Sequence, residues 1–227
     1  MMLSSGAVVM FAPIFDAVRQ AFFDEALLPR FDGGFVSARQ ARLARTQELR
    51  DLFSAEQVAS LFAAPGSAWL SGDITQDKAP ELRRYLVQEL KVPEVTPEQI
   101  VLKLSKEFLE AQADEWTARL YEFLGGQKAI SERLDTVPLI RLDDGTHVVA
   151  RASGRALAFL PSAIETSFPA VRRAVCATSA SRAFLILLGL TEPDPVDDVV
   201  WNVLPRYKGT RVGGEPTAYS ADIDRVL

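Results

Sequence analysis

The sequence holds a single histidine, His147, and any imidazole-assisted catalysis would have to use it. It lies four residues after Asp143 and three after Asp144, just past a turn that contains Gly145. A histidine in such a turn is usually solvated, so we expect His147 at the surface, with an enzyme that uses this turn as an alternative. One histidine beside two turn carboxylates is an ordinary polar turn rather than a metal site.

A second candidate is the basic, glycine-containing segment PRYKGTRVGGEP at residues 205–216. Its backbone N–H groups and the cations Arg206, Lys208 and Arg211 could contact an anion. In a P-loop, however, the lysine directly follows the last glycine, whereas Lys208 precedes the glycine pair. The alternative interpretation of this segment is a linker.

Two charged clusters favour structural roles. The acidic run EPDPVDD at residues 192–198 precedes a predicted helix, whose N-terminus favours negative charge. Arg39, Arg42 and Arg45 recur every three residues, which predicts a solvated stripe on one helical face. The sequence contains no nucleophile elbow, P-loop, zinc-protease helix or paired-cysteine motif. It therefore predicts no catalytic, cofactor-binding or metal-binding residue.

The composition is that of a globular protein. The chain has 227 residues, 48% of them hydrophobic, and a net charge of -5, which argues against a general binder of nucleic acid or of anionic membranes. Its longest apolar run, residues 183–190, is far shorter than a membrane-spanning helix requires. Because Cys176 is the single cysteine, it forms no disulfide within the chain. We expect a cytoplasmic protein without a membrane segment.

The periodicity of apolar residues and the capping signals predict a mainly helical α+β fold with two short β-hairpins. Turns rich in Asp and Gly place the hairpins around residues 32–34 and 143–145, with Gly34 and Gly145 at positive φ. The predicted helical segments are 15–28, 38–53, 58–62, 79–90, 97–109, 114–124, 170–175, 179–188 and 196–204.

Two strings in the sequence repeat in the same order. LLPRFDGGFVSA (27–38) resembles VPLIRLDDGTHVVA (137–150), and QELKVPEVTPEQIVLKL (88–104) resembles LLGLTEPDPVDDVVWNVL (187–204). Common turn and cap signals could coincide by chance, but their matched order favours an internal duplication. The expected organisation is an N-terminal helix (1–26), a first unit of a hairpin and helices (27–124), a second such unit (125–208) and a linker (209–227).

As an ordered set, LLPRFDGGFVSA, WLSGDIT, LRRYLVQEL, VPLIRLDDGTHVVA and LLGLTEPDPVDDVVWNVLPRY resemble the region that follows the ATP-binding domain in bacterial sacsin-like and NO VEIN-like proteins. Those proteins begin with a Bergerat-type ATPase domain. Its Glu and Asn four residues apart and its Asp-x-Gly-x-Gly loop are missing here, and the only asparagine is Asn202. The resemblance thus implies an ATPase upstream of this chain and no nucleotide-contacting residue within it.

The function that this resemblance implies is a non-catalytic scaffold, client-contact or coupling segment, with protein partners or adjoining domains and no cofactor. A stand-alone protein-interaction module is the alternative. The N-terminal stripe of Phe15, Val18, Phe22 and Phe23 would be left without a cover in such a segment. Because soluble proteins rarely expose a large apolar patch, we expect a homodimer through the N-terminal helix.

Overall fold

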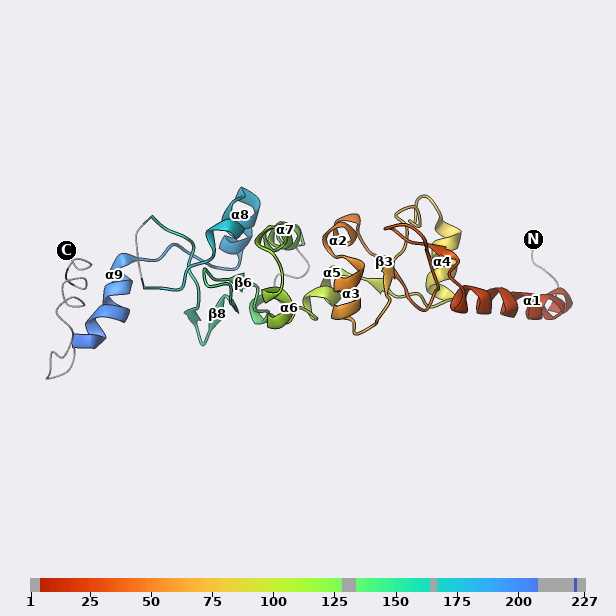
Figure 1. Cartoon of the computed structure of the whole chain (residues 1–227), viewed down its shortest axis with the longest axis horizontal. Coiled ribbons are helices and arrows are strands. Elements are labelled where there is room, and N and C mark those ends of the chain that lie inside the picture. The colour runs from red at the N-terminus through yellow and green to blue at the C-terminus, as the bar shows by residue number, and fades with distance from the viewer. Residues whose placement is uncertain (1–4, 128–133, 164–166, 208–222, 224–227) are drawn as a thin grey trace. The chain divides into compact units, whose positions relative to one another are not determined.

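The computed structural model describes residues 5–127, 134–163, 167–207 and 223 (Figure 1). The chain divides into two compact units, residues 1–104 and 105–227. The first unit contains, in order, α1 (Ser5–Asp24), β1 (Leu28–Pro29), β2 (Phe35–Val36), β3 (Ala41–Ala44), α2 (Gln47–Leu52), α3 (Ala55–Leu61), β4 (Ala68–Trp69), α4 (Pro80–Gln88), β5 (Glu94–Val95) and α5 (Pro97–Val101). Helices and hairpins thus form the mainly helical α+β fold that the sequence predicts.

Local capping signals set the helix starts of this unit. Ser54 accepts a hydrogen bond from the N–H of Gln57, whose side chain accepts from the N–H of Ser54, a complete capping box at the start of α3. Thr96 and Gln99 make the same box before α5, and Pro80 occupies the first turn of α4. Helix α3 therefore begins at Ala55, before the predicted segment 58–62, while α4 and α5 begin within one residue of their predicted starts.

The prediction of a helical segment over residues 38–53 is wrong in its first half. Residues Ala41–Ala44 form β3, the central strand of a three-stranded parallel sheet in the order β4-β3-β5. Ala41 and Leu43 point into the core while Arg42 is only half-buried, which is the two-residue alternation of a strand. The arginine spacing therefore does not form a helical stripe.

The two faces of this sheet carry different helices. Ala41, Leu43, Ala68 and Leu70 share one hydrophobic cluster with Leu86 and Leu90, at the C-terminal end of α4. On the other face, the indole of Trp69 donates a hydrogen bond of 2.6 Å to Phe53 O, at the end of α2. Figure 1 accordingly shows α2 and α3 on one side of β3 and α4 on the other.

The second unit contains, in order, α6 (Lys106–Glu110), α7 (Asp114–Gly125), β6 (Ile140–Arg141), β7 (His147–Val148), β8 (Arg151–Ala152), β9 (Arg155–Ala156), the 3-10 helix η2 (Arg173–Cys176), α8 (Ser179–Leu187), α9 (Pro195–Asp198), η3 (Val199–Val203) and η4 (Leu204–Tyr207). Tyr121 on α7 packs against Phe184 on α8, with ring centroids 5.4 Å apart. The residue at which we expected the first unit to end, 124, lies on α7, which packs inside this second unit.

Several predicted helices have different limits. The segment 97–109 divides because Ser105 caps a separate helix, α6, and accepts a hydrogen bond from the N–H of Phe108. Ala170 is not helical, since it pairs with Phe159 in an isolated bridge. Residues 196–204 contain the five-residue π-type turn η3 instead of a continuous α-helix.

The helical pattern of residues 196–204 places Val200, Val203 and Leu204 on one buried face, and this expectation is wrong for two of the three. Val203 is buried, whereas Val200 and Leu204 are exposed.

The two predicted hairpins, β1 with β2 and β6 with β7, are antiparallel pairs, and Gly34 and Gly145 have the predicted positive φ, at +76° and +89°. Both hairpins, and a segment that follows each of them, make corresponding backbone bonds to later parts of the chain. In the first unit the N–H groups of Phe31, Ser71 and Leu43 donate to Trp69 O (2.9 Å), Pro29 O (2.9 Å) and Pro93 O (3.0 Å). In the second unit the N–H groups of Asp143, Arg172 and Leu160 donate, in the same order, to Ala170 O (3.1 Å), Arg141 O (3.0 Å) and Thr191 O (2.9 Å). Among the described residues, α2 and α3 have no counterpart in the second unit, nor β8 and β9 in the first. The origin of the two units from one duplicated ancestor stays a prediction.

Within the described ranges, no helix is both long and apolar enough to span a lipid bilayer.

Candidate functional site

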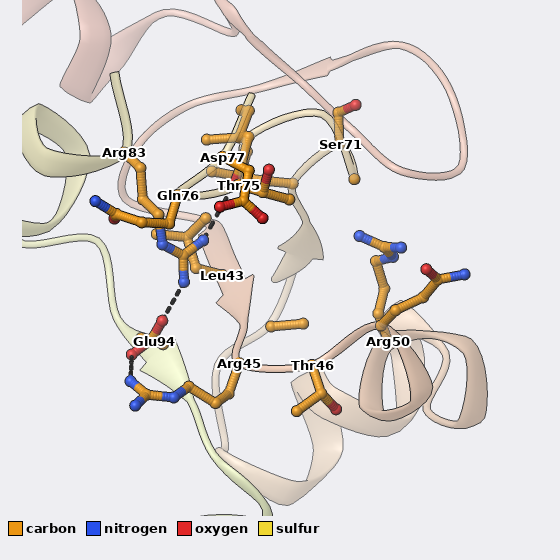
Figure 2. A pocket seen from close by; sticks show the side chains of 15 residues that line it. Leu43, Arg45, Thr46, Arg50, Ser71, Thr75, Gln76, Asp77, Arg83 and Glu94 are labelled. Atoms are coloured by element: carbon orange, nitrogen blue, oxygen red, sulfur yellow. Dashed lines mark hydrogen bonds and ion pairs between the residues drawn. The ribbon is translucent and has the colours of Figure 1, made fainter. Parts of the chain in front are cut away.

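A cavity of about 470 Å³ lies in the first unit, at the carboxyl ends of β3 and β4 (Figure 2). Its wall includes Arg45 and Thr46, which follow β3, and the loop from Leu70 to Asp77, which follows β4. Helix α2 contributes Arg50, α4 contributes Arg83 and β5 contributes Glu94. The volume is within the range of small-molecule sites, about 300–1,000 Å³.

The topology explains why a cavity forms at this place. From β3 the chain passes through α2 and α3 to β4 on one edge of the sheet, and from β4 it returns through α4 to β5 on the other edge. Right-handed connections that run in opposite directions cover opposite faces, so the loops after β3 and β4 diverge. Open parallel sheets bind ligands in the crevice at such a switch point.

Hydrogen bonds between residues close in sequence shape the loop after β4. Ser71 Oγ accepts from the N–H of Asp73 at 3.3 Å, and Thr75 Oγ1 accepts from the N–H of Lys78 at 3.1 Å. The Lys78 ammonium lies 2.7 Å from the Asp73 carboxylate, and its hydrogen bond lowers the pKa of Asp73. The side chains of Asp73 and Lys78 are therefore paired with each other.

One side of the cavity is an ion-pair network (Figure 2). Glu94 accepts from Arg83 through one carboxylate oxygen and from Arg45 through the other, the latter at 2.8 Å. Arg83 also donates to the carbonyl oxygen of Ile74 at 3.0 Å. Both guanidinium groups thus already have a carboxylate partner.

Arg50, on the opposite side in Figure 2, is different. Its side chain is only 12% exposed, and its nearest carboxylate oxygen, on Asp51, lies 3.8 Å from Nε. No residue that the structure describes accepts a hydrogen bond from this Nε. The guanidinium lies over the ring of Phe31, 4.4 Å from its centroid, and a Cβ added at Gly72 would come within 2.7 Å of Nη1. The aromatic ring and the glycine backbone thus confine a cation whose Nε lacks a hydrogen-bond acceptor and whose ion pair with Asp51 is long.

The lining contains neither histidine nor cysteine, and its hydroxyl groups, Thr46, Ser71 and Thr75, accept hydrogen bonds from backbone N–H groups of α2 or of the loop after β4. The chemistry that this arrangement offers is recognition of a polar, anionic molecule rather than nucleophilic attack. The sequence reasoning missed the site. Two features of the sequence could have indicated it. The apolar residues Ala41 and Leu43 alternate as in a strand, and the extended Trp69 is followed by the polar loop Ser71-Gly72-Asp73.

The expectation that His147 is at the surface is wrong, because its side chain is buried in the second unit. Its Nδ1 lies 3.1 Å from Pro138 O and its Nε2 lies 3.4 Å from Arg141 Nη1, so the ring donates to the carbonyl and accepts from the guanidinium. Burial and the nearby Arg141 charge lower the pKa of His147. The residue acts as a neutral link between β7, β6 and the segment before them.

The other predicted candidates are only partly described. Lys208, Arg211 and the side chain of Arg206 lie outside the described residues. In the acidic run, Asp194 accepts from the N–H of Val196 at 2.8 Å, which agrees with the predicted capping role. Asp198 is buried and accepts from Asn202 Nδ2 at 2.7 Å. No metal-ligating group of three acidic, His or Cys residues occurs in the part that the structure describes.

Helix α1 carries an apolar stripe that its own unit does not cover. Phe11, Ile14, Phe15 and Val18 are 40%, 59%, 64% and 45% exposed. The C-terminal end of the helix is fixed instead: Phe22 O accepts from the N–H of Ala38 at 2.8 Å. The prediction that Phe22 and Phe23 belong to the same exposed stripe is wrong, since both pack against the core of the first unit.

A scan against protein-family models and searches of curated proteins and of solved structures find no match to this chain.

Proposed function

We propose that the chain is a non-catalytic scaffold and protein-contact segment, of the kind that its resemblance to sacsin-like ATP-binding proteins implies. The observation that carries this proposal is that α1 exposes an apolar stripe while its C-terminal end is hydrogen-bonded to the rest of the first unit. An isolated helix gains little stability from its own hydrogen bonds, and an apolar helix face is normally buried against another surface.

The partner in this proposal is a second copy of the chain. The stripe residues Phe11, Ile14, Phe15 and Val18 have the spacing i, i+3, i+4, i+7, which reads the same in both directions. A two-fold axis between Ile14 and Phe15 therefore places Phe11 opposite Val18 of the second copy and Ile14 opposite Phe15. This self-complementarity is what an isologous interface requires.

The proposal also covers cofactors and the class of partner. A segment that contacts proteins needs no cofactor, and the net charge of -5 does not favour nucleic acid as the partner.

A cytoplasmic location agrees with the single thiol, Cys176. Burial raises its pKa to about 11, so the thiol stays protonated and unreactive near neutral pH. A stand-alone interaction module would use the same helix face. The alternative of an enzyme at His147 gains no support from a ring whose two nitrogens are both engaged.

The test is the molar mass in solution, measured by size-exclusion chromatography with light scattering. The wild-type chain of 24.9 kDa should elute with twice that mass. Phe15→Glu should weaken the dimer by about thirtyfold or more, because a central aromatic anchor is replaced by a charge. Phe35→Glu is the matched control, since Phe35 is 63% exposed but lies on β2, and this variant should remain dimeric.

A wild-type chain that stays monomeric at all concentrations would remove the second copy from the proposal. In that case, a pull-down by α1 of the domain that precedes this region in a sacsin-like protein, abolished by Phe15→Glu, would identify an adjoining domain as the occupant. Absence of both results would refute the contact role of this helix.

A further inference from the structure

We infer that the cavity of the first unit is a binding site for a small polar molecule with one oxyanion group, a phosphate monoester or a carboxylate, which pairs with Arg50. The inference is independent of the dimer proposed above, since none of the cavity residues lies on α1.

The first argument is the energy of a buried cation that has only one long ion pair. Removing a guanidinium from water is costly unless acceptors replace its hydration shell. Arg50 is 12% exposed, its Nε has no acceptor among the described residues, and the nearest carboxylate is 3.8 Å away. A bound oxyanion that accepts from the guanidinium where it lines the cavity would be a closer partner than Asp51 and would lower this cost.

The second argument is that the guanidinium is preorganised. Phe31 supports one face of the group, and the missing side chain of Gly72 leaves room for Nη1 beside the loop after β4. A guanidinium held in one plane can donate two parallel hydrogen bonds to a carboxylate or a phosphate. Lysine at this position could not present the same fork.

The third argument is charge selectivity. The cavity wall carries the cations Arg45, Arg50 and Arg83 and the anions Asp77 and Glu94. These three cations and two anions leave a net charge of +1 on the wall, and Arg50 is the cation that does not share Glu94. One remaining positive charge fits a molecule with one oxyanion group rather than a polyphosphate.

The remaining wall indicates the body of the ligand. The cavity of about 470 Å³ is several times larger than one phosphate group, and Gln47, Ser71, Thr75 and Gln76 line it beside the charged residues. Amide and hydroxyl groups recognise hydroxylated molecules better than hydrocarbon ones. A sugar phosphate or a hydroxy acid has this combination of features.

The experiment is a titration of the full chain in a phosphate-free chloride buffer with inorganic phosphate, ribose 5-phosphate or glycerate, followed by calorimetry and thermal melting. Wild type should bind at least one of the three saturably, with a raised melting temperature. Arg50→Met should lose at least tenfold in affinity. Arg84→Met is the control, because Arg84 is exposed on α4 and does not line the cavity. Tighter binding of ribose 5-phosphate than of glycerate identifies the phosphate source, and the reverse order identifies a carboxylate.

Two further measurements separate binding from folding. Without ligand, Arg50→Met should melt no lower than Arg84→Met, because the substitution removes a buried charge whose ion pair with Asp51 is long, and keeps the packing on Phe31. In wild type, amide shifts induced by the tightest ligand should centre on residues 70–77. The inference is refuted if no probe binds wild type, if Arg50→Met binds as well as Arg84→Met, or if the shifts lie elsewhere.

Discussion

The hydroxyl group of Tyr121 joins α7 to the second hairpin, so Tyr121→Phe is a sharp test of how that unit is held together. The side chain is fully buried. Its hydroxyl donates to Leu139 O at 2.7 Å and accepts from the N–H of Arg141 at 3.1 Å. The substitution removes one oxygen atom and leaves a buried carbonyl and a buried N–H without a partner.

The expected loss follows from these two orphaned groups. An unsatisfied buried polar group costs about 1–3 kcal/mol, and relief of hydroxyl desolvation offsets part of the sum, so we expect a loss of about 2 kcal/mol in the free energy of unfolding. With a urea m-value of about 2 kcal/mol/M, the unfolding midpoint of the second unit should fall by about 1 M. Burial raises the pKa of Tyr121 far above its ordinary value, so the loss should be equal at pH 7 and pH 9.

The assay is urea unfolding followed by circular dichroism, with Tyr85→Phe as the matched control. Tyr85 packs edge-on against Phe22 in the first unit, and its hydroxyl makes no hydrogen bond to a residue that the structure describes. Its substitution should change stability by less than about 0.5 kcal/mol. Equal midpoint shifts in the two variants would refute the account of Tyr121 as the link between helix and hairpin.

Two other outcomes are expected. The pKa of His147 in the folded chain is lowered from 6.5, so the unfolded chain binds the proton at a higher pH, and the free energy of unfolding should decline as the pH falls below 6.5. His147→Asn should flatten this decline in the urea midpoints between pH 7 and pH 5, and an unchanged slope would contradict the prediction. Magnesium-ATP should give no saturable micromolar isotherm in calorimetry, because the Bergerat motifs are missing from the sequence and a cavity wall with a net charge of +1 cannot neutralise a triphosphate. A one-to-one isotherm that survives Arg50→Met would contradict this and would indicate binding at residues 205–216.

Local chemistry determined much of the fold. The capping boxes at Ser54 and Thr96 satisfy backbone N–H groups with side chains three residues away, so the sequence alone predicts them. The same holds for Gly145, whose positive φ follows from the tight turn between β6 and β7. These features depend only on residues close together in the chain.

Tertiary structure decided the sheet and the candidate site. Strand β3 pairs Ala41 with Ala68 and Leu43 with Glu94, and the alternation over four residues was too short to outweigh the helical spacing of its arginines. The same distant pairings bring Arg50, Gly72 and Glu94 around one cavity. No local motif in the sequence indicates this arrangement.

The burial of His147 and the exposure of Phe15 have the same physical origin. Whether a side chain meets water depends on which distant segments fold over it. For His147 such a segment is α6, whose Glu110 accepts from the His147 N–H, and for Phe15 there is none within the described first unit. The sequence by itself therefore determined turns, caps and the α+β class, whereas parallel pairing between distant strands determined where a ligand could bind.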